Sequence, residues 1–361
     1  MMFALGIDNA KGNLPAGRMG LITNLGSVTS QIEPNIDFLI SRGFNIRRVF
    51  TPEHGLYGTE SNGAEIDDSS YRGIEATSLY GARMKPNKSD LDGLDFLVYD
   101  IQDAGVRFYT FISTLYNAVE ASSENSIPLY VLDRPNPLNS TDINGPVLRE
   151  EFRSFVGTDT LPSRYGLTIG ELALFFNRRF NAEVKVVKMA DYSRNYYFDD
   201  IFSWFIPPSL NLPDMNSVIT YSGLCLLEAS DLSVGRGTPY PFHFFGKPGL
   251  PELDHYQDGL VLRRTKYRPT LDPFSGELVD GYFIHITDRK KFDPFRLALT
   301  ILVKLHEFDS VTINRQKLSR LYGSDELYRM LESGTSVDEI LYSWKADQDD
   351  FRKNTEQFHL Y

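Results

Sequence analysis

With 361 residues, the chain is long enough for two domains that each bury a hydrophobic core. Its composition, 42% hydrophobic and 24% charged residues, is that of an ordinary globular protein. The net charge of −11 disfavours nucleic acids and other polyanions as partners, although a few local arginines can still bind a small anion.

The cysteine content and the start of the chain indicate the compartment. Cys225 is the only cysteine in the sequence, so no intrachain disulfide forms, and its apolar neighbours indicate a buried structural thiol. The start reaches Asp8 too early for the apolar core of a signal peptide, and no stretch approaches the roughly 20 apolar residues of a membrane-spanning helix. We therefore expect a cytoplasmic protein without a membrane partner.

Strands and helices alternate along the first 190 residues. Apolar runs predict strands at residues 19–24, 46–50, 95–101, 128–132 and 184–189, and helical spacing predicts helices at 32–42, 111–123 and 168–180. The run 95–101 is apolar on both faces, as in a central parallel strand. Thr168 and Glu171 have the spacing of a capping box. This alternation predicts an α/β fold, with a Rossmann-like, doubly wound parallel sheet over residues 1–190.

The second half has a different pattern. Aromatic residues and prolines crowd positions 192–213, after which strands near 281–287 mix with helices near 294–308 and 336–344. We therefore expect a smaller α+β domain over residues 191–361. Within the first half, residues 56–78 lack a clear period, which indicates a functional loop or lid.

Polar side chains follow the first four predicted strands of the first domain. Because the carboxyl ends of parallel strands lie at one edge of a sheet, we expect these groups to converge on one crevice. They are Asn24 after the first strand, Glu53 and His54 after the second, Asp100, Gln102, Asp103 and Arg107 after the third, and Asp133 and Arg134 after the fourth. Each alone has a simpler interpretation as a turn or cap residue, so the prediction depends on the coincidence across four strands.

The motifs that the sequence lacks exclude several kinds of active site. It has no glycine-rich phosphate-binding motif, no Gly-x-Ser-x-Gly nucleophile motif and no histidines at metal-binding spacing. We therefore expect no nucleotide, metal or other cofactor. Carboxylates, arginines and aromatic residues remain, and two carboxylates that flank a bond are the groups that hydrolyse glycosides. Glu53 is the candidate acid, provided that apolar neighbours such as Phe50 remove it from water.

The second half adds further candidate residues. Arg236 lies between Gly235 and Gly237, where a tight backbone can approach a ligand and the guanidinium can bind a carboxylate. The alternative is an ordinary surface turn. Glu228 is either a second acid or the partner in a buried ion pair, and Asn211 lies in a rigid loop between prolines, where its amide can bind an acetamido or hydroxyl group.

Longer motifs, in the same order along the chain, resemble a known family. Residues 51–55 (Thr-Pro-Glu-His-Gly), 99–110, 132–137 and 235–238 are similar to motifs of the YbbC/NamZ family of exo-β-N-acetylmuramidases, and the resemblance covers essentially the whole chain. It implies a Rossmann-like domain and a smaller domain with the active site in the cleft between them. It also implies release of N-acetylmuramic acid from the non-reducing ends of peptidoglycan fragments, without a metal or nucleotide. The family's catalytic glutamate falls on Glu53.

The candidates then take specific roles. We expect Glu53 to be the general acid/base, and Asp100 or Asp103 either to be its carboxylate partner or to orient the 2-acetamido group of the substrate. Tyr109 stacks on the sugar ring or simply packs. The other expected substrate-binding residues are Asn24, His54, Gln102, Asp133, Asn211 and Glu228.

The arginines are candidates for the lactyl carboxylate that distinguishes muramic acid from glucosamine: Arg107, Arg134 and Arg236. The sequence departs from the family pattern at Tyr165, where histidine is common, and at Val234, where the family has a carboxylate. Two alternatives therefore stay open, a hydrolase of another β-linked amino-sugar glycoside and a non-catalytic carbohydrate-binding protein. The oligomeric state is left open as well.

Overall fold

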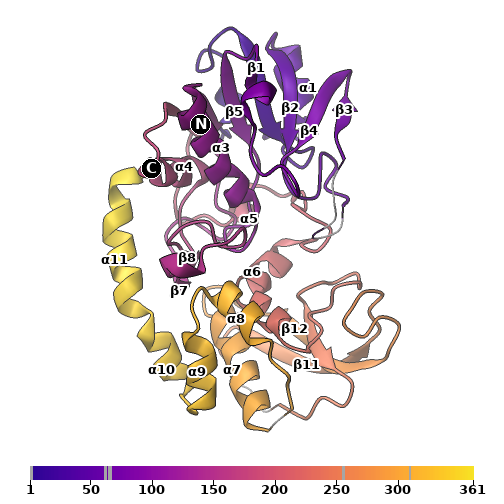
Figure 1. Cartoon of the computed structure of the whole chain (residues 1–361). Helices are drawn as coiled ribbons and strands as arrows, with labels where there is room; N and C mark the ends of the chain where they lie inside the picture. Colours follow the sequence, from indigo (N-terminus) through magenta and orange to yellow (C-terminus); the bar gives the residue numbers. More distant parts are fainter. Residues whose placement is uncertain (1–2, 61–62, 64–66, 254–256, 309) are drawn as a thin grey trace.

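The computed structural model describes residues 3–60, 63, 67–253, 257–308 and 310–361, which form two domains stacked one above the other (Figure 1). The larger domain has a seven-stranded sheet in the order β3-β4-β2-β1-β5-β6-β9. Its strands are β1 (Arg18–Thr23), β2 (Asn45–Thr51), β3 (Ser69–Tyr71), β4 (Ile74–Ser78), β5 (Phe96–Asp100), β6 (Leu129–Leu132) and β9 (Val184–Val187). Neighbouring strands pair in parallel, except for the antiparallel hairpin of β3 and β4.

Five α-helices and a second hairpin complete the described part of this domain. The elements are α1 (Asn35–Ser41), α2 (Lys88–Leu91), α3 (Phe111–Asn125), α4 (Ile169–Asn177), α5 (Phe198–Ile201), β7 (Asn144–Val147) and β8 (Pro162–Arg164). The predicted capping box begins α4, because the Thr168 side chain accepts a hydrogen bond from the backbone N–H of Glu171, and the Glu171 carboxylate accepts one from the N–H of Thr168. The hairpin of β7 and β8 lies at the end of the domain that faces the second domain (Figure 1).

The order of the strands places a switch point at β1. The chain passes from β1 to β2 on one side and later returns to β5 on the other side of β1. All five residues of β5 are buried, as expected for a central parallel strand. The predicted α/β fold with a mostly parallel sheet is therefore confirmed, and the carboxyl ends of β1 and β5 mark the place where such sheets usually bind ligands.

The smaller domain has a three-stranded antiparallel sheet in the order β10-β12-β11. Its elements are α6 (Met215–Leu224), β10 (Phe244–Lys247), β11 (Leu260–Tyr267), β12 (Val279–Ile286), α7 (Pro294–Glu307), α8 (Arg315–Tyr322), α9 (Glu326–Glu332), α10 (Val337–Ser343) and α11 (Lys345–Thr355). Helix α6 packs closely on α7 because Gly223 has no side chain, and a Cβ there would lie 2.1 Å from the carbonyl oxygen of Pro294. None of the described helices combines the length and apolar character needed to cross a bilayer.

The segment between β9 and α6 packs on the first domain. The ring of Tyr192 contacts the rings of Phe3 and Tyr361, and the backbone N–H of Phe198 donates to the carbonyl oxygen of Pro137 at 3.1 Å. The chain therefore crosses into the second domain just before α6, after the position near residue 190 that the composition suggested.

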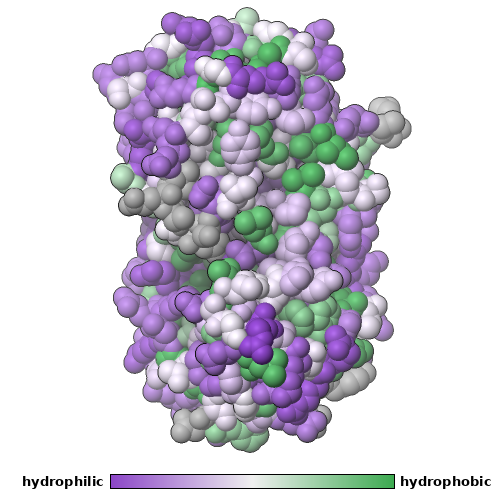
Figure 2. Space-filling view, turned by 90° about the vertical axis from the view of Figure 1, so that its right-hand side faces the viewer, coloured by the Kyte–Doolittle hydropathy of each residue, from purple (hydrophilic) through white to green (hydrophobic). Residues whose placement is uncertain are grey.

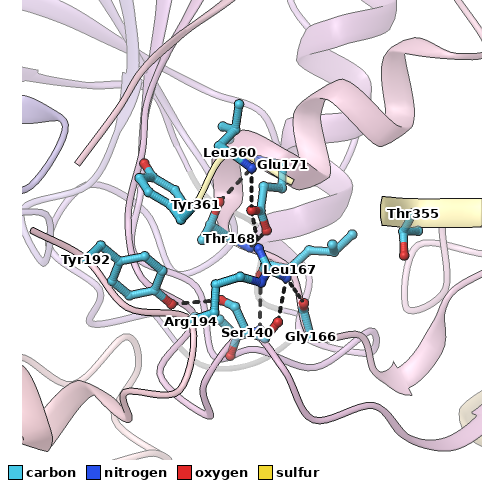
Figure 3. A network of polar contacts seen from close by, with 12 residues as sticks. Ser140, Gly166, Leu167, Thr168, Glu171, Tyr192, Arg194, Thr355, Leu360 and Tyr361 are labelled. Carbon is cyan, nitrogen blue, oxygen red and sulfur yellow. Dashed lines mark hydrogen bonds and ion pairs between the residues drawn. The ribbon is translucent and has the colours of Figure 1, made fainter. Parts of the chain in front are cut away.

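The end of the chain returns to the first domain. Helix α11 runs from the second domain back along the first (Figure 1), and the residues after it enter a buried polar network (Figure 3). The Tyr361 hydroxyl donates to Asp133 Oδ2 at 2.7 Å and accepts from the N–H of Met189 at 2.8 Å, while the N–H of Leu360 donates to Glu171 Oε1 at 2.9 Å. Asp133 and Glu171 are fully buried, and burial raises the pKa of Asp133 to about 7. Asp133 thus anchors the C-terminal segment.

Replacement of Tyr361 by phenylalanine tests this anchor. The change leaves the Met189 N–H without its acceptor and Asp133 Oδ2 without one donor, so the free energy of unfolding is expected to fall by about 1–3 kcal/mol. Urea denaturation measures the change. Tyr342→Phe is the matched control, because the Tyr342 side chain is 72% exposed. Equal losses in the two variants would contradict an anchoring role for the Tyr361 hydroxyl.

Candidate active site

A cavity of about 250 Å³ lies between the two domains. The first domain contributes Glu53, His54, Phe108, Tyr109, Thr110 and Val156. The connecting loop contributes Ser209, Asn211 and Leu212, and the second domain contributes Tyr221, Cys225, Glu228, Arg236, Phe242, Lys317 and Leu321. The space-filling view shows hydrophobic and weakly polar residues across the middle of the face that it draws (Figure 2).

Glu53 lies directly after β2 and is only 7% exposed. Its Oε2 accepts a hydrogen bond from Thr110 Oγ1 at 2.5 Å, and its Oε1 accepts one from the backbone N–H of Gly63 at 3.0 Å. Thr110 is also the residue that precedes α3, so the carboxylate lies beside the positive end of a 15-residue helix. The backbone then turns sharply, because both His54 and Gly55 have φ near +72°. Such strained non-glycine residues are frequent at functional sites.

His54 fixes the loop that follows Glu53. Its Nδ1 lies 2.7 Å from the carbonyl oxygen of Glu60, and its own carbonyl oxygen accepts a hydrogen bond from the Glu60 N–H at 3.3 Å. Because a carbonyl oxygen only accepts, the hydrogen-bond network assigns the ring proton to Nδ1. In the neutral imidazole, Nε2 is then an acceptor, and the ring borders the cavity.

Aromatic rings form much of the cavity wall. Tyr109 makes edge contacts with Phe111 and Tyr221, at centroid distances of 4.7 and 6.3 Å, and Tyr221 contacts Phe242 at 4.7 Å. Burial raises the pKa of Tyr109 well above its usual range. The Tyr109 hydroxyl is therefore neutral and can serve as a donor, and the wall offers the apolar surface on which sugar rings pack.

Glu228 and Arg236 face the cavity as an ion pair. Arg236 Nε lies 2.6 Å from Glu228 Oε1, Nη2 lies 3.2 Å from Oε2, and the guanidinium lies 5.1 Å from the centroid of the Phe242 ring. The turn around Arg236 is tight, with positive φ at both Gly235 and Gly237. The carboxylate and guanidinium are held rigidly and largely balance each other's charge.

The switch point of the sheet is filled by another ion pair. Asp100 and Arg134 are both buried, with Arg134 Nε 2.6 Å from Oδ1 and Nη2 3.0 Å from Oδ2. Asn35 Nδ2 donates to Asp100 Oδ2 at 2.6 Å, and Arg134 Nη2 also donates to the carbonyl oxygen of Val28. The hydrogen bonds of Asp100 and Arg134 are thus made within the fold, and neither residue is among those that line the cavity. The crevice expected at the switch point is displaced to the end of β2.

Asp103 and Gln102 shape the loop after β5. Asp103 Oδ2 accepts hydrogen bonds from the N–H of Gly105 at 2.6 Å and from the Tyr165 hydroxyl. Burial raises the pKa of Asp103 to about 7, although these hydrogen bonds oppose the shift. Gln102 Nε2 donates to the carbonyl oxygens of Asp103 and Pro135. Tyr165, at the position where the resembling family commonly has histidine, is therefore the hydroxyl partner of Asp103.

Arg107 connects the two domains. It is fully buried, and its Nη2 donates to the carbonyl oxygens of Leu321 at 3.2 Å and Tyr322 at 3.0 Å. These carbonyls belong to the last turn of α8, where a helix favours a cation. Burial lowers the pKa of Arg107 to about 10. A Cβ at Gly323 would lie 3.1 Å from Nη2, so glycine leaves room for the guanidinium.

Six of the sequence-derived candidates therefore border the cavity: Glu53, His54, Tyr109, Asn211, Glu228 and Arg236. The structure places the other candidates within the fold, including Asn24, whose Oδ1 accepts a hydrogen bond from Ser27 Oγ at 3.2 Å. Sequence reasoning missed Thr110, although it ends the motif at residues 99–110. It also missed Lys317, which no local pattern distinguishes from other lysines on a polar helix face.

The comparisons with known proteins match the parts of the chain that contain all the residues lining the cavity. The family model described as the N-terminal part of exo-beta-N-acetylmuramidase NamZ matches residues 19–216, and the model of the C-terminal part matches residues 219–361. The peptidoglycan beta-N-acetylmuramidase NamZ of Bacillus subtilis (strain 168) is 36% identical over 370 residues, which cover 98% of this chain and 89% of that protein.

Two crystal structures of DUF1343 family proteins from Bacteroides fragilis have the same architecture. One has a TM-score of 0.89 at 29% identity and covers 99% of each chain. The other has a TM-score of 0.83 at 27% identity and covers 100% of this chain and 99% of the other.

Proposed function

The chain belongs to the NamZ family of exo-β-N-acetylmuramidases, and we propose that it releases N-acetylmuramic acid from the non-reducing ends of peptidoglycan fragments. It is accordingly a glycoside hydrolase. The observation that carries the proposed mechanism is the position of Glu53, a buried carboxylate held by two donors at the wall of an aromatic-lined cavity.

Glu53 is the general acid/base in this proposal. In its acid form it gives a proton to the glycosidic oxygen while the bond to the anomeric carbon breaks, and its carboxylate form then accepts a proton from the water that completes hydrolysis. Thr110 and the N–H of Gly63 fix the carboxylate from two sides, which limits its rotation away from the bond.

The size of the cavity supports action on a terminal sugar. At about 250 Å³ it is slightly smaller than the roughly 300–1,000 Å³ of pockets that hold drug-sized ligands, so it suits one sugar residue rather than a length of glycan. Tyr109, Tyr221 and Phe242 supply the faces and edges against which the sugar packs. This shape favours removal of single residues from a chain end.

Glu228 is the second carboxylate that we place beside the substrate. Unlike Asp100 and Asp103, it borders the cavity, and Arg236 holds it in one orientation. A rigid carboxylate–guanidinium pair offers both acceptors and donors to sugar hydroxyl and acetamido groups. Asn211 and the Tyr109 hydroxyl complete the polar groups that we assign to substrate binding.

The proposal is tested by assaying the purified chain on a panel of aryl β-glycosides and on defined peptidoglycan fragments. We expect release of the aryl group from the N-acetylmuramide, and free N-acetylmuramic acid together with fragments shortened from the non-reducing end, identified by mass spectrometry. Preference for another glycoside in the panel would reject the muramic substrate. Calorimetric binding of the fragments without turnover over days would reject the catalytic assignment.

A further inference from the structure

The described acidic and basic residues around the cavity are equal in number, but only one acid and one base among them form an ion pair. Of the described residues that line it, Glu53 and Glu228 are acidic and Arg236 and Lys317 are basic. Arg236 forms a bidentate ion pair with Glu228. Glu53 takes its hydrogen bonds from a threonine hydroxyl and a backbone N–H rather than from a cation. Lys317 is thus the cation of the lining whose charge is not matched within this set.

Lys317 lies on the first turn of α8, on the side that faces the cavity. Asn314 caps the helix by accepting a hydrogen bond from the Lys317 N–H at 2.9 Å, and α8 packs against the turn Cys225–Ala229 that carries Glu228. The Lys317 side chain is exposed, and no carboxylate of the described residues forms an ion pair with it. A cation at the beginning of a helix is unfavourable to the helix itself, so helix stability does not explain its presence.

We propose that Lys317 is a specificity-determining residue that binds the lactyl carboxylate of the muramic acid residue. The inference rests on the proposed function and names the group that selects muramic acid over glucosamine. The lactyl ether carries the carboxylate by which a terminal N-acetylmuramic acid differs from N-acetylglucosamine. Arg107 and Arg134, which the sequence suggested for this role, are buried and bonded to groups of the fold. An ammonium on a flexible stem at the cavity border can follow the lactyl group as it enters.

The proposed contact between Lys317 and the lactyl carboxylate lies away from the glycosidic bond that breaks. Its loss is therefore expected to change KM more than kcat. Lys317→Gln should raise KM for an aryl β-N-acetylmuramide about fivefold, the upper range for an exposed ion pair, and leave kcat nearly unchanged. The inhibition constant of free N-acetylmuramic acid should rise by the same factor, and that of N-acetylglucosamine should stay the same. Lys317→Glu should raise the muramide KM further, and Lys317→Arg should restore most of the wild-type value.

Arg320→Gln is the matched control. It removes the same charge from the same helix, but Arg320 borders a separate surface groove with Glu151 and Phe152. Salt gives a second readout, since raising ionic strength from about 0.01 M to about 1 M shortens the screening length from roughly 30 Å to roughly 3 Å. The muramide KM of the wild type should rise with salt, whereas that of Lys317→Gln should change little.

The outcomes separate this inference from the proposed function. A wild-type chain without activity on the muramide rejects the proposed function itself. An active wild type with unchanged muramide KM and N-acetylmuramic acid inhibition in Lys317→Gln rejects only the role of Lys317. Equal effects on the inhibition constants of both sugars would also overturn it, because they would indicate a general change in the cavity.

Discussion

Replacement of Glu53 by glutamine is expected to lower kcat on an aryl β-N-acetylmuramide by about 10²- to 10⁴-fold, the usual contribution of general acid–base catalysis. Glutamine keeps the size of the side chain, and its carbonyl oxygen can still accept the hydrogen bond from Thr110 or from Gly63. The amide has no acidic proton to give to the glycosidic oxygen. The loss should therefore appear in kcat, with KM changed much less.

The neighbouring acid on the same loop is the control for this variant. Glu60 is exposed, and only its backbone contacts His54, so Glu60→Gln removes one charge without touching the cavity. Thermal unfolding of both variants establishes that each is folded. Comparable kcat values for Glu53→Gln and the wild type would show that another residue supplies the proton.

Replacement of Asp100 by asparagine is expected to have its large effect on stability. The change leaves the buried guanidinium of Arg134 without its counter-charge and turns an amide toward donors that now bond to Asp100 Oδ2. Breaking a buried ion pair from one side costs about 3–5 kcal/mol, so the free energy of unfolding measured in urea should fall by that amount. Catalysis per folded molecule should be unchanged, because Asp100 does not border the cavity.

Asp95→Asn provides the comparison, since Asp95 pairs with Arg18 at an exposed position just before the same strand. Solvent screens such a pair, so the stability of this variant should differ far less from that of the wild type. If Asp100→Asn were as stable as the wild type but lost kcat, Asp100 would be the carboxylate partner that the sequence suggested.

Much of the fold could be predicted because its signals are local. The apolar run that becomes β5 and the capping box of Thr168 and Glu171 both depend on neighbouring residues. The position at which the chain leaves the first domain could not be predicted in this way. It depends on the packing of Tyr192 on Phe3 and Tyr361, residues that are far apart in the sequence.

For the site, the sequence could predict which edge of the sheet it occupies, but not which side chains at that edge face the cavity. Parallel topology places the residues after each strand at one edge, and Glu53 and His54, two of these residues, line the cavity. Whether a side chain at that edge faces a ligand or the core depends on distant partners. Asp100 turns to Arg134 and Asn35, whereas Arg107 reaches the last turn of α8.

The return of α11 has a consequence for how the two domains move. The chain crosses between the domains once before α6 and again through α11, whose following residues are fixed to Asp133 and Glu171. Arg107 adds a third attachment at the end of α8. Two domains tied by a single linker can swing apart, but a hinge with several attachments has little freedom to rotate. The spacing of the cavity walls on either side of Glu53 is therefore expected to stay constant through turnover.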